Sequence, residues 1–172
     1  KKEFPKIITL MGGPNFNTFN METYFQKRPY LNYFVINQGE TGFLNLIELY
    51  SKNMMPHKDS KKEPVVIDNV GYYDDRQKKI IMGNINQRYK DLDIIPSAYQ
   101  EGMLDEFFED PTLIPIIETM RGCPFSCTYC AWGDDWLRSS NRFSLQRIQG
   151  DLDYIAKHMK NSSYLYIADS NF

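Results

Sequence analysis

Three cysteines lie within eight residues, at Cys123, Cys127 and Cys130, and the chain contains no others. Their spacing is C-x3-C-x2-C, and an aromatic residue, Tyr129, stands directly before the last of them. Thiolates are the ligands that iron–sulfur clusters use in proteins. Three of them on one short loop hold a four-iron cluster and leave one iron open to a substrate or cosubstrate. The pattern therefore predicts chemistry at this loop as well as structure.

Zinc is the alternative metal for the same loop. The three cysteines together with His57 or His158, the only histidines, would complete a Cys₃His tetrahedron. Zinc loops usually pair their ligands as C-x2-C knuckles, whereas this loop follows an apolar, strand-like run. A disulfide framework is disfavoured because an odd number of cysteines leaves one unpaired. An iron–sulfur site is thus the leading interpretation, and a zinc- or cluster-stabilised binding module without catalysis is the alternative.

The length and composition are those of a globular chain. It has 172 residues, of which 42% are hydrophobic and 15% aromatic, so a packed core is expected. A formal net charge of −2 gives no electrostatic reason to expect nucleic-acid binding. The sequence has neither an apolar run as long as a membrane span nor a signal-peptide pattern at its start. With reduced thiols, these features favour a cytoplasmic protein without a membrane span.

Apolar runs and helical patterns alternate in the first part of the chain. Buried strands are expected over residues 6–11 and 33–36, each followed by a turn that contains glycine. Helices are expected over residues 22–27 and from an N-cap at Thr41 to about residue 50. The second helix would bury a stripe made of Phe43, Leu46, Ile47 and Tyr50. This order of elements predicts a parallel α/β layer.

The middle of the chain reads as a connection that contains one hairpin. Residues 51–64 are polar and rich in lysine, which indicates an exposed segment, and β character resumes at residues 65–67. Residues 71–73 and 79–82 are expected to pair as a hairpin with a long turn between them. Residues 84–112 are expected to form a linker wrapped over a surface.

The cysteine loop is expected to lie inside a βαβ unit. An apolar strand over residues 113–119 delivers the chain to the loop. A helix follows over residues 145–159 with Ser144 as its N-cap, and a last strand spans residues 164–168. Two strands joined through a helix pair in parallel, with a right-handed crossover in nearly all cases.

The cysteine loop resembles that of the radical S-adenosylmethionine (radical SAM) enzymes, through R-G-C-P at residues 121–124, the cysteine spacing and Tyr129. The resemblance implies that Cys123, Cys127 and Cys130 hold a 4Fe-4S cluster whose open iron is chelated by S-adenosyl-L-methionine (AdoMet). One electron then cleaves AdoMet into methionine and a 5′-deoxyadenosyl radical, which abstracts hydrogen from a small-molecule substrate. The resemblance also implies that Tyr129 lies beside the adenine and that an electron donor such as flavodoxin or ferredoxin serves the cluster.

The rest of the chain resembles the branch of that family that carries an N-terminal cobalamin-binding domain. Gly12 and Gly13 resemble a glycine loop of that Rossmann-like domain, and Gly39 and Glu40 resemble the turn after its final strand. The resemblance thus implies that these four residues approach cobalamin. The alternatives are local ones: the first pair closes a strand with a tight turn, and the glutamate caps or solvates the following helix.

The resemblance implies an α/β fold in three parts. Residues 1–55 correspond to the C-terminal part of a Rossmann-like cobalamin-binding domain and residues 56–112 to a connector with a β-hairpin. Residues 113–172 correspond to the N-terminal part of a partial (β/α) TIM-like radical SAM barrel. Asp169 and Asn171 end its second strand, where ligands of α/β proteins bind, which points to a role toward AdoMet.

The chain departs from the family pattern at two places. It has no D-x-H-x-x-G sequence, so the histidine that ligates cobalt in many cobalamin proteins is absent from it. The glycine–glycine–glutamate element after the second barrel strand is replaced by residues 169–172, D-S-N-F. We expect an internal fragment that is inactive by itself, because half a barrel does not enclose a radical.

The leading prediction is a radical SAM enzyme that carries out cobalamin-associated methyl transfer, or a radical rearrangement or ring closure. A further hypothesis keeps the cluster but drops cobalamin, so that the first part of the chain serves only as a scaffold.

Overall fold

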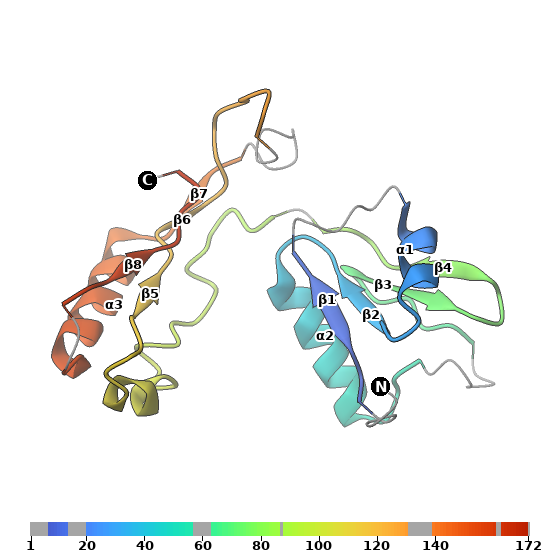
Figure 1. Cartoon of the computed structure of the whole chain (residues 1–172), viewed down its shortest axis with the longest axis horizontal. Coiled ribbons are helices and arrows are strands. Elements are labelled where there is room, and N and C mark those ends of the chain that lie inside the picture. The colour runs from blue at the N-terminus through green and yellow to red at the C-terminus, as the bar shows by residue number, and fades with distance from the viewer. Residues whose placement is uncertain are drawn as a thin grey trace. The chain divides into compact units, whose positions relative to one another are not determined.

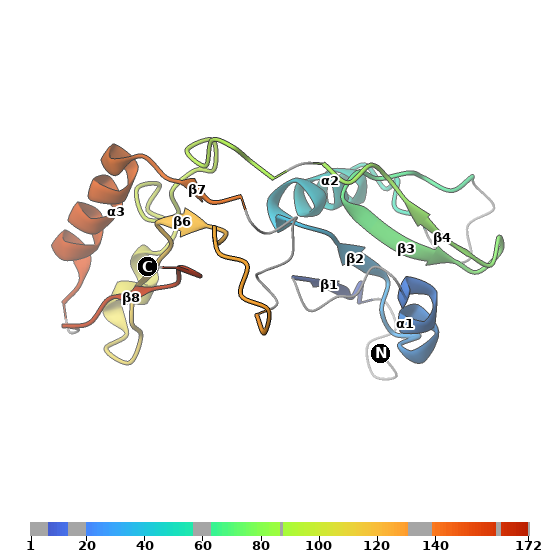
Figure 2. The same ribbon diagram turned by 90° about the horizontal axis from the view of Figure 1, so that it is seen from above.

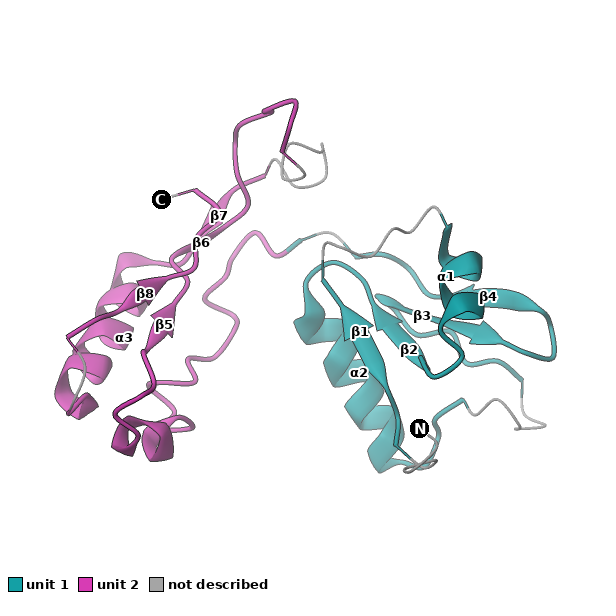
Figure 3. Ribbon diagram, viewed as in Figure 1, with its two compact units in different colours: residues 1–88 teal, residues 89–172 magenta. Residues whose placement is uncertain are grey.

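The computed structural model describes residues 7–13, 20–56, 63–86, 88–130, 139–160 and 163–171. The chain forms two compact units, residues 1–88 and 89–172 (Figure 3). The expected connector, residues 56–112, is divided between them: residues 56–88, with the hairpin, belong to the first unit and residues 89–112 to the second. Within the described residues, no helix has the length and apolar character needed to cross a membrane.

The first unit is built on a four-stranded mixed sheet of order β1-β2-β3-β4 (Figure 1). Its strands are β1 (Leu10–Gly12), β2 (Tyr33–Val35), β3 (Val70–Asp74) and β4 (Lys79–Met82). Strands β1 and β2 are parallel, as the strand–helix–strand order predicts, whereas β3 and β4 pair as an antiparallel hairpin. Strand β3 also pairs antiparallel with β2, so the hairpin extends the sheet and is not part of a separate connector.

Strand β2 forms the centre of the first unit because both of its faces are buried. Its side chains alternate, so Tyr33 and Val35 face one side of the sheet and Phe34 the other. Helix α2 (Gly39–Ser51) packs on the first side through Leu46, and helix α1 (Met21–Lys27) packs on the second through Phe25. Figure 2 shows the two helices on opposite faces of the sheet. The buried strand expected over residues 33–36 is thus confirmed.

Two expectations for the first unit were wrong in detail. Helix α2 begins at Gly39 with Gln38 as its N-cap, so Thr41 lies inside the helix and does not cap it. Strand β1 is not buried, because it lies at the edge of the sheet and has a neighbour on one side only; Leu10 is 39% exposed. Lys6, the first residue of the strand expected there, lies outside the described residues.

The expected apolar stripe of helix α2 is buried at one position only. Leu46 is in the core, whereas Phe43, Ile47 and Tyr50 are exposed. These three side chains line an apolar groove of about 420 Å³. The other residues of the groove are Ile7, Ile8, Leu10, Tyr33, Leu46 and Met55. Helical spacing correctly identified one face of the helix, but periodicity does not say which part of that face is covered.

The second unit contains the expected βαβ arrangement. Strand β5 (Ile116–Ile117) pairs in parallel with β8 (Tyr166–Ile167), and helix α3 (Leu145–His158) lies between them in sequence. Ser144 is the N-cap of α3, and its hydroxyl accepts a hydrogen bond from the Arg147 amide at 3.1 Å, as predicted. A second ladder joins β6 (Met120–Arg121) to β7 (Asn141–Arg142) in antiparallel orientation. The strands are much shorter than the apolar runs that predicted them.

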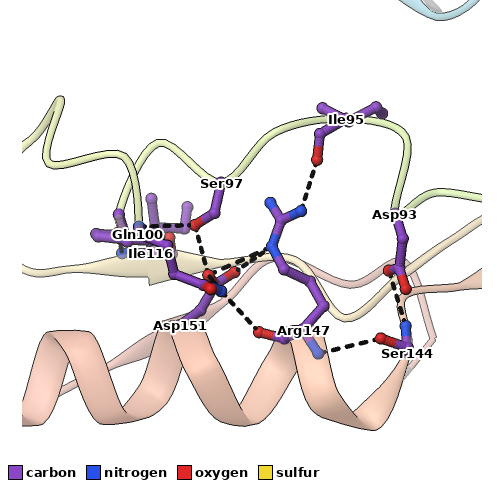
Figure 4. A network of polar contacts seen from close by, with 9 residues as sticks. Asp93, Ile95, Ser97, Gln100, Ile116, Ser144, Arg147 and Asp151 are labelled. Carbon is purple, nitrogen blue, oxygen red and sulfur yellow. Dashed lines mark hydrogen bonds and ion pairs between the residues drawn. The ribbon is translucent and has the colours of Figure 1, made fainter.

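Polar contacts from residues 92–100 hold the segment before β5 against helix α3 (Figure 4). The Asp151 carboxylate accepts from Ser97 Oγ at 2.5 Å and Gln100 Nε2 at 2.7 Å, and pairs with Arg147 Nε at 3.1 Å. Arg147 also donates to the Ile95 carbonyl. Both members of the ion pair are about 15% exposed, at 16% and 15%. The segment is therefore an integral layer of the second unit.

The start of α3 and the edge of β5 receive two further contacts from this segment. The Asp93 carboxylate accepts a hydrogen bond from the Ser144 amide, and the bonds that it accepts from Ser144 hold the pKa of Asp93 below its ordinary value. The Tyr99 hydroxyl donates to the Ile116 carbonyl at 2.7 Å and accepts from the Ile116 amide at 3.0 Å. Tyr99 thus occupies both hydrogen-bonding groups that β5 turns away from β8.

We predict that Gly42→Ala destabilises the first unit by about 1 kcal/mol or more. A Cβ at residue 42 would lie 2.7 Å from Val35 Cγ1 and 3.0 Å from the Asn69 carbonyl, so α2 would have to move off the sheet. Thermal unfolding measures the effect. Gly39→Ala is the matched control, because a Cβ there meets nothing within 4 Å. Equal unfolding temperatures for the two variants would contradict the packing described.

We predict that Asp151→Ala destabilises the second unit by about 2 kcal/mol, because it leaves the guanidinium and two donors without their acceptor. Urea unfolding, monitored through a spectroscopic signal from the second unit, measures this loss in the free energy of unfolding. Asp153→Ala is the control: this exposed residue on the same helix accepts a hydrogen bond from Gln149 Nε2 at 2.8 Å and takes no part in the network. A loss no larger than that of the control would show that the network does not fasten the segment.

Candidate functional site

The cysteine loop leaves the second unit at the end of strand β6. Gly122 follows this strand with φ = 96°, a left-handed conformation that favours glycine, and the loop begins at the next residue, Cys123. The Cys130 amide donates to the Cys127 carbonyl at 3.1 Å, which places these two residues at the ends of one turn. All three cysteines are free thiols. Cys127 is exposed, and Cys123 and Cys130 are half-buried.

The thiols lie on one loop but do not converge on one point. Among the described residues, no three Cys, His, Asp or Glu side chains lie close enough together to hold a metal ion. The donor set itself suits an iron–sulfur cluster, since it consists of three thiols, free of disulfides, on a short exposed loop.

Tyr129 projects from the same turn and is 90% exposed. A hydrogen bond with the Cys127 side chain, together with negative charge at that side chain, raises the pKa of the Tyr129 hydroxyl above its ordinary value. Within the part of the chain that the structure describes, no aromatic ring stacks on it. An aromatic face beside the cysteines is thus open to a planar ligand.

The neck of the loop is closed by the β6–β7 ladder. Met120 pairs with Arg142 and Arg121 with Asn141, and the Phe143 amide donates to the Thr119 carbonyl at 3.0 Å. The chain thus leaves at residue 121 and returns at residue 141 side by side. Residues 131–138 lie outside the described residues. The ladder fixes both ends of the segment that contains the cysteines.

Asp169 and Ser170 contact the same neck from the end of strand β8. The Asp169 carboxylate accepts from the Thr119 amide at 2.8 Å, the Met120 amide at 3.2 Å and the Thr119 hydroxyl. Ser170 Oγ donates to the Gly122 carbonyl at 3.2 Å. Asp169 therefore lies at the C-terminal end of the parallel strands, as expected, and both of its oxygens have protein partners. Asn171 lies two residues on and is half-buried.

A second ion pair lies beside the neck. Arg121 Nε donates to Glu118 Oε2 at 2.7 Å, and these side chains are 18% and 35% exposed. Glu118 and Thr119 were not among the candidate residues from the sequence, and Arg121 was named only as part of the R-G-C-P motif. Thr119 could not be found in advance, because its partner Asp169 is 50 residues away.

Gly12, Gly13, Gly39 and Glu40 all lie near the carboxyl ends of strands β1 and β2. Gly12 ends β1 and is in register with Val35, the last residue of β2. Gly13 follows with φ = 101°, and Gly39 begins helix α2 a few residues after β2. Gly39 is exposed and Glu40 half-buried. Because β1 and β2 are parallel, their carboxyl ends, where ligands of α/β sheets bind, lie at the same edge.

The structure argues against His158 as a fourth metal ligand beside the three cysteines. Its ring stacks on Tyr154 with centroids 4.0 Å apart, and its Nδ1 lies 2.8 Å from the Tyr154 carbonyl oxygen. It is the last residue of α3, whose 14 residues span about 21 Å from the end that adjoins β7. His158 is half-buried. His57, the other histidine, lies outside the described residues.

Comparisons with known proteins agree with this arrangement of fold and loop. No protein-family model matches the chain. The cobalamin-dependent radical SAM methyltransferase TokK of Streptomyces tokunonensis is 27% identical over 177 residues, which cover 100% of this chain and 24% of that protein. The 2-(S-pantetheinyl)-carbapenam-3-carboxylate methyltransferase of Streptantibioticus cattleyicolor matches with the same identity and coverage. The chain spans about a quarter of the length of these relatives.

A solved structure carries the same fold. The cobalamin-dependent radical enzyme OxsB, with aqua-cobalamin and AdoMet bound, superposes on 96% of this chain and 21% of its own, with a TM-score of 0.62 and 24% sequence identity. The chain is thus an α/β protein that resembles cobalamin-dependent radical SAM enzymes. Its homologues include the cobalamin-dependent radical SAM methyltransferase TokK, which confirms the resemblance stated from the sequence.

Proposed function

We propose that the protein is a radical SAM enzyme in which Cys123, Cys127 and Cys130 hold a 4Fe-4S cluster, with cobalamin-associated methyl transfer as its reaction. The observation that carries this proposal is the three free thiols on a single loop whose two ends are fixed by one ladder. Its homology to methyltransferases of this kind supports methyl transfer over rearrangement. An electron donor such as flavodoxin or ferredoxin and a small-molecule substrate are part of the proposal.

The residues of the chain would act by binding and orientation. When bound, the cluster supplies the electron that cleaves AdoMet into methionine and a 5′-deoxyadenosyl radical. The three thiolates hold it, and the exposed Tyr129 ring offers a stacking face for the adenine beside Cys127. We propose Asn171, two residues beyond Asp169, as a polar contact for AdoMet. We assign residues 113–172 to the start of the radical SAM barrel.

The first unit supplies the proposed cobalamin site. Gly12 and Gly13 end one parallel strand, and Gly39 and Glu40 follow the next. A side chain at residue 39 would meet nothing within 4 Å, so the surface there is open to a bulky ligand. We infer that residues 1–55 contribute this edge of a Rossmann-like sheet to cobalamin binding.

We predict that anaerobic reconstitution with iron and sulfide loads about four irons per chain, with the broad visible absorption of a 4Fe-4S centre. Cys127→Ala should abolish the electron paramagnetic resonance signal of the reduced protein that AdoMet perturbs. Ser126→Ala is the matched control, because it alters an exposed neighbour in the same loop without removing a thiolate. Stoichiometric zinc with no chromophore would instead identify the zinc-stabilised binding module.

We predict that the protein retains about one cobalamin per chain after gel filtration and that Gly39→Val loses it, because the added side chain occupies the open surface at the end of β2. Absorption in the visible region measures the bound cofactor. Leu145→Val is the control, since it places the same residue at another exposed first position of a helix, 84% exposed in α3. Retention by both variants would show that the surface at residue 39 is not the cobalamin site, and a wild-type protein that retains no cobalamin would leave the first unit as a scaffold, as the cobalamin-free hypothesis requires.

A further inference from the structure

The chain changes its hydrogen-bonding partner just before the cysteine loop. Up to Ile117 it pairs in parallel with β8, and the Ala168 amide donates to the Ile117 carbonyl at 2.8 Å as the last contact of that ladder. From Met120 onward it pairs antiparallel with β7. Thr119 lies between the two ladders, and Met120 is the first residue of the second. Amides shielded from water are costly without an acceptor, so the change of partner needs an acceptor at this point.

The Asp169 side chain accepts from the amides of both residues. Its Oδ1 lies 2.8 Å from the Thr119 amide and 3.2 Å from the Met120 amide, and its Oδ2 accepts from the Thr119 hydroxyl. Bonds from N–H groups to a carboxylate are charge-assisted and stronger than those between neutral groups. Asp169 lies two residues beyond the end of β8, and its carboxylate continues the ladder at the point where the backbone ends it.

We propose that Asp169 is a positioning residue for the cluster loop: its carboxylate fixes Thr119 and Met120 and thereby sets where Cys123 begins. Together with these two residues it forms what we call the Asp169 clamp. Ser170, whose hydroxyl donates to the Gly122 carbonyl, extends the clamp to the residue directly before Cys123. The inference rests on the proposed function, and it gives Asp169 a different role from that of a direct AdoMet ligand.

The clamp would fix Cys123, whose position the Cys127–Cys130 turn does not determine. Cys127 and Cys130 belong to one turn and move together, whereas Cys123 is joined to them only through Pro124, Phe125 and Ser126. The position of Cys123 relative to that turn is therefore set by its other neighbour, Gly122, and by what holds Gly122. Ligands fixed by a surrounding layer of hydrogen bonds typically bind metal about 10–100-fold more tightly than unsupported ones.

Hydrogen exchange of the apo-protein tests the clamp without any cluster. Asp169→Ala should raise exchange at the Thr119 and Met120 amides by about 10-fold or more, because it removes their acceptor. Asp169→Asn should keep most of the protection, because an amide oxygen accepts from both N–H groups. Asp153→Ala, an exposed carboxylate on α3, is the control and should change neither amide. Equal exchange in wild type and Asp169→Ala would overturn the clamp.

Cluster retention and AdoMet binding then separate the two roles of Asp169. After reconstitution, Asp169→Ala should lose iron to a ferrous chelator about 10-fold faster than wild type, and Asp169→Asn should be close to wild type. In Asp169→Asn, AdoMet should still shift the electron paramagnetic resonance signal of the reduced cluster. Normal iron retention in both variants, with the AdoMet shift lost in both, would identify a direct ligand and overturn the proposal.

Ser170→Ala decides the question if Asp169→Ala does not fold. It removes one hydroxyl and should speed iron loss by a smaller factor, about twofold to threefold, with an unchanged melting temperature of the apo-protein. Iron loss at the wild-type rate would count against the clamp. A wild-type protein that binds no cluster would overturn the proposed function, and the hydrogen-exchange result would then still stand as the test of the clamp.

Discussion

The second unit depends on a change of hydrogen-bonding partner along one stretch of chain, which pairs first with β8 and then with β7. Residues 116–117 belong to a parallel ladder and residues 120–121 to an antiparallel one, and a chain that changes partners exposes the amides in between. The Asp169 carboxylate accepts from the amides of Thr119 and Met120 at this junction. The cysteine loop begins at Cys123, three residues beyond Met120, and returns along β7, so the position of the loop is set at this junction.

The segment before β5 is as much a part of this unit as the strands are. Its polar side chains meet on Asp151 and Arg147 of helix α3, and Tyr99 occupies the backbone groups of Ile116 that face away from β8. A strand edge with free amide and carbonyl groups invites pairing with another chain. A single phenol that both donates to and accepts from the edge satisfies it without adding a strand. Helix α3 is consequently held from two sides, by the strands and by this segment.

In the first unit, glycine has opposite effects on packing at two nearby positions. The parallel strands β1 and β2 end on the same side of the sheet, where Gly12, Gly13 and Gly39 stand. A Cβ at Gly39 would meet nothing within 4 Å, so the surface there is open, whereas Gly42, one turn into α2, lets the helix approach Val35 closely.

Local patterns in the sequence determined most of the elements and the chemical type of the site. The spacing of Cys123, Cys127 and Cys130, the N-cap at Ser144 and the hairpin of β3 and β4 depend on neighbours within a few residues, and the structure contains the last two as predicted. What only the tertiary structure decided are contacts over long separations. The hairpin joins the sheet of β2, only Leu46 of the expected apolar stripe of α2 is buried, and the Asp169 carboxylate reaches Thr119 across 50 residues. Periodicity records which side chains are apolar, but burial and hydrogen-bond partners depend on which distant segment folds against them.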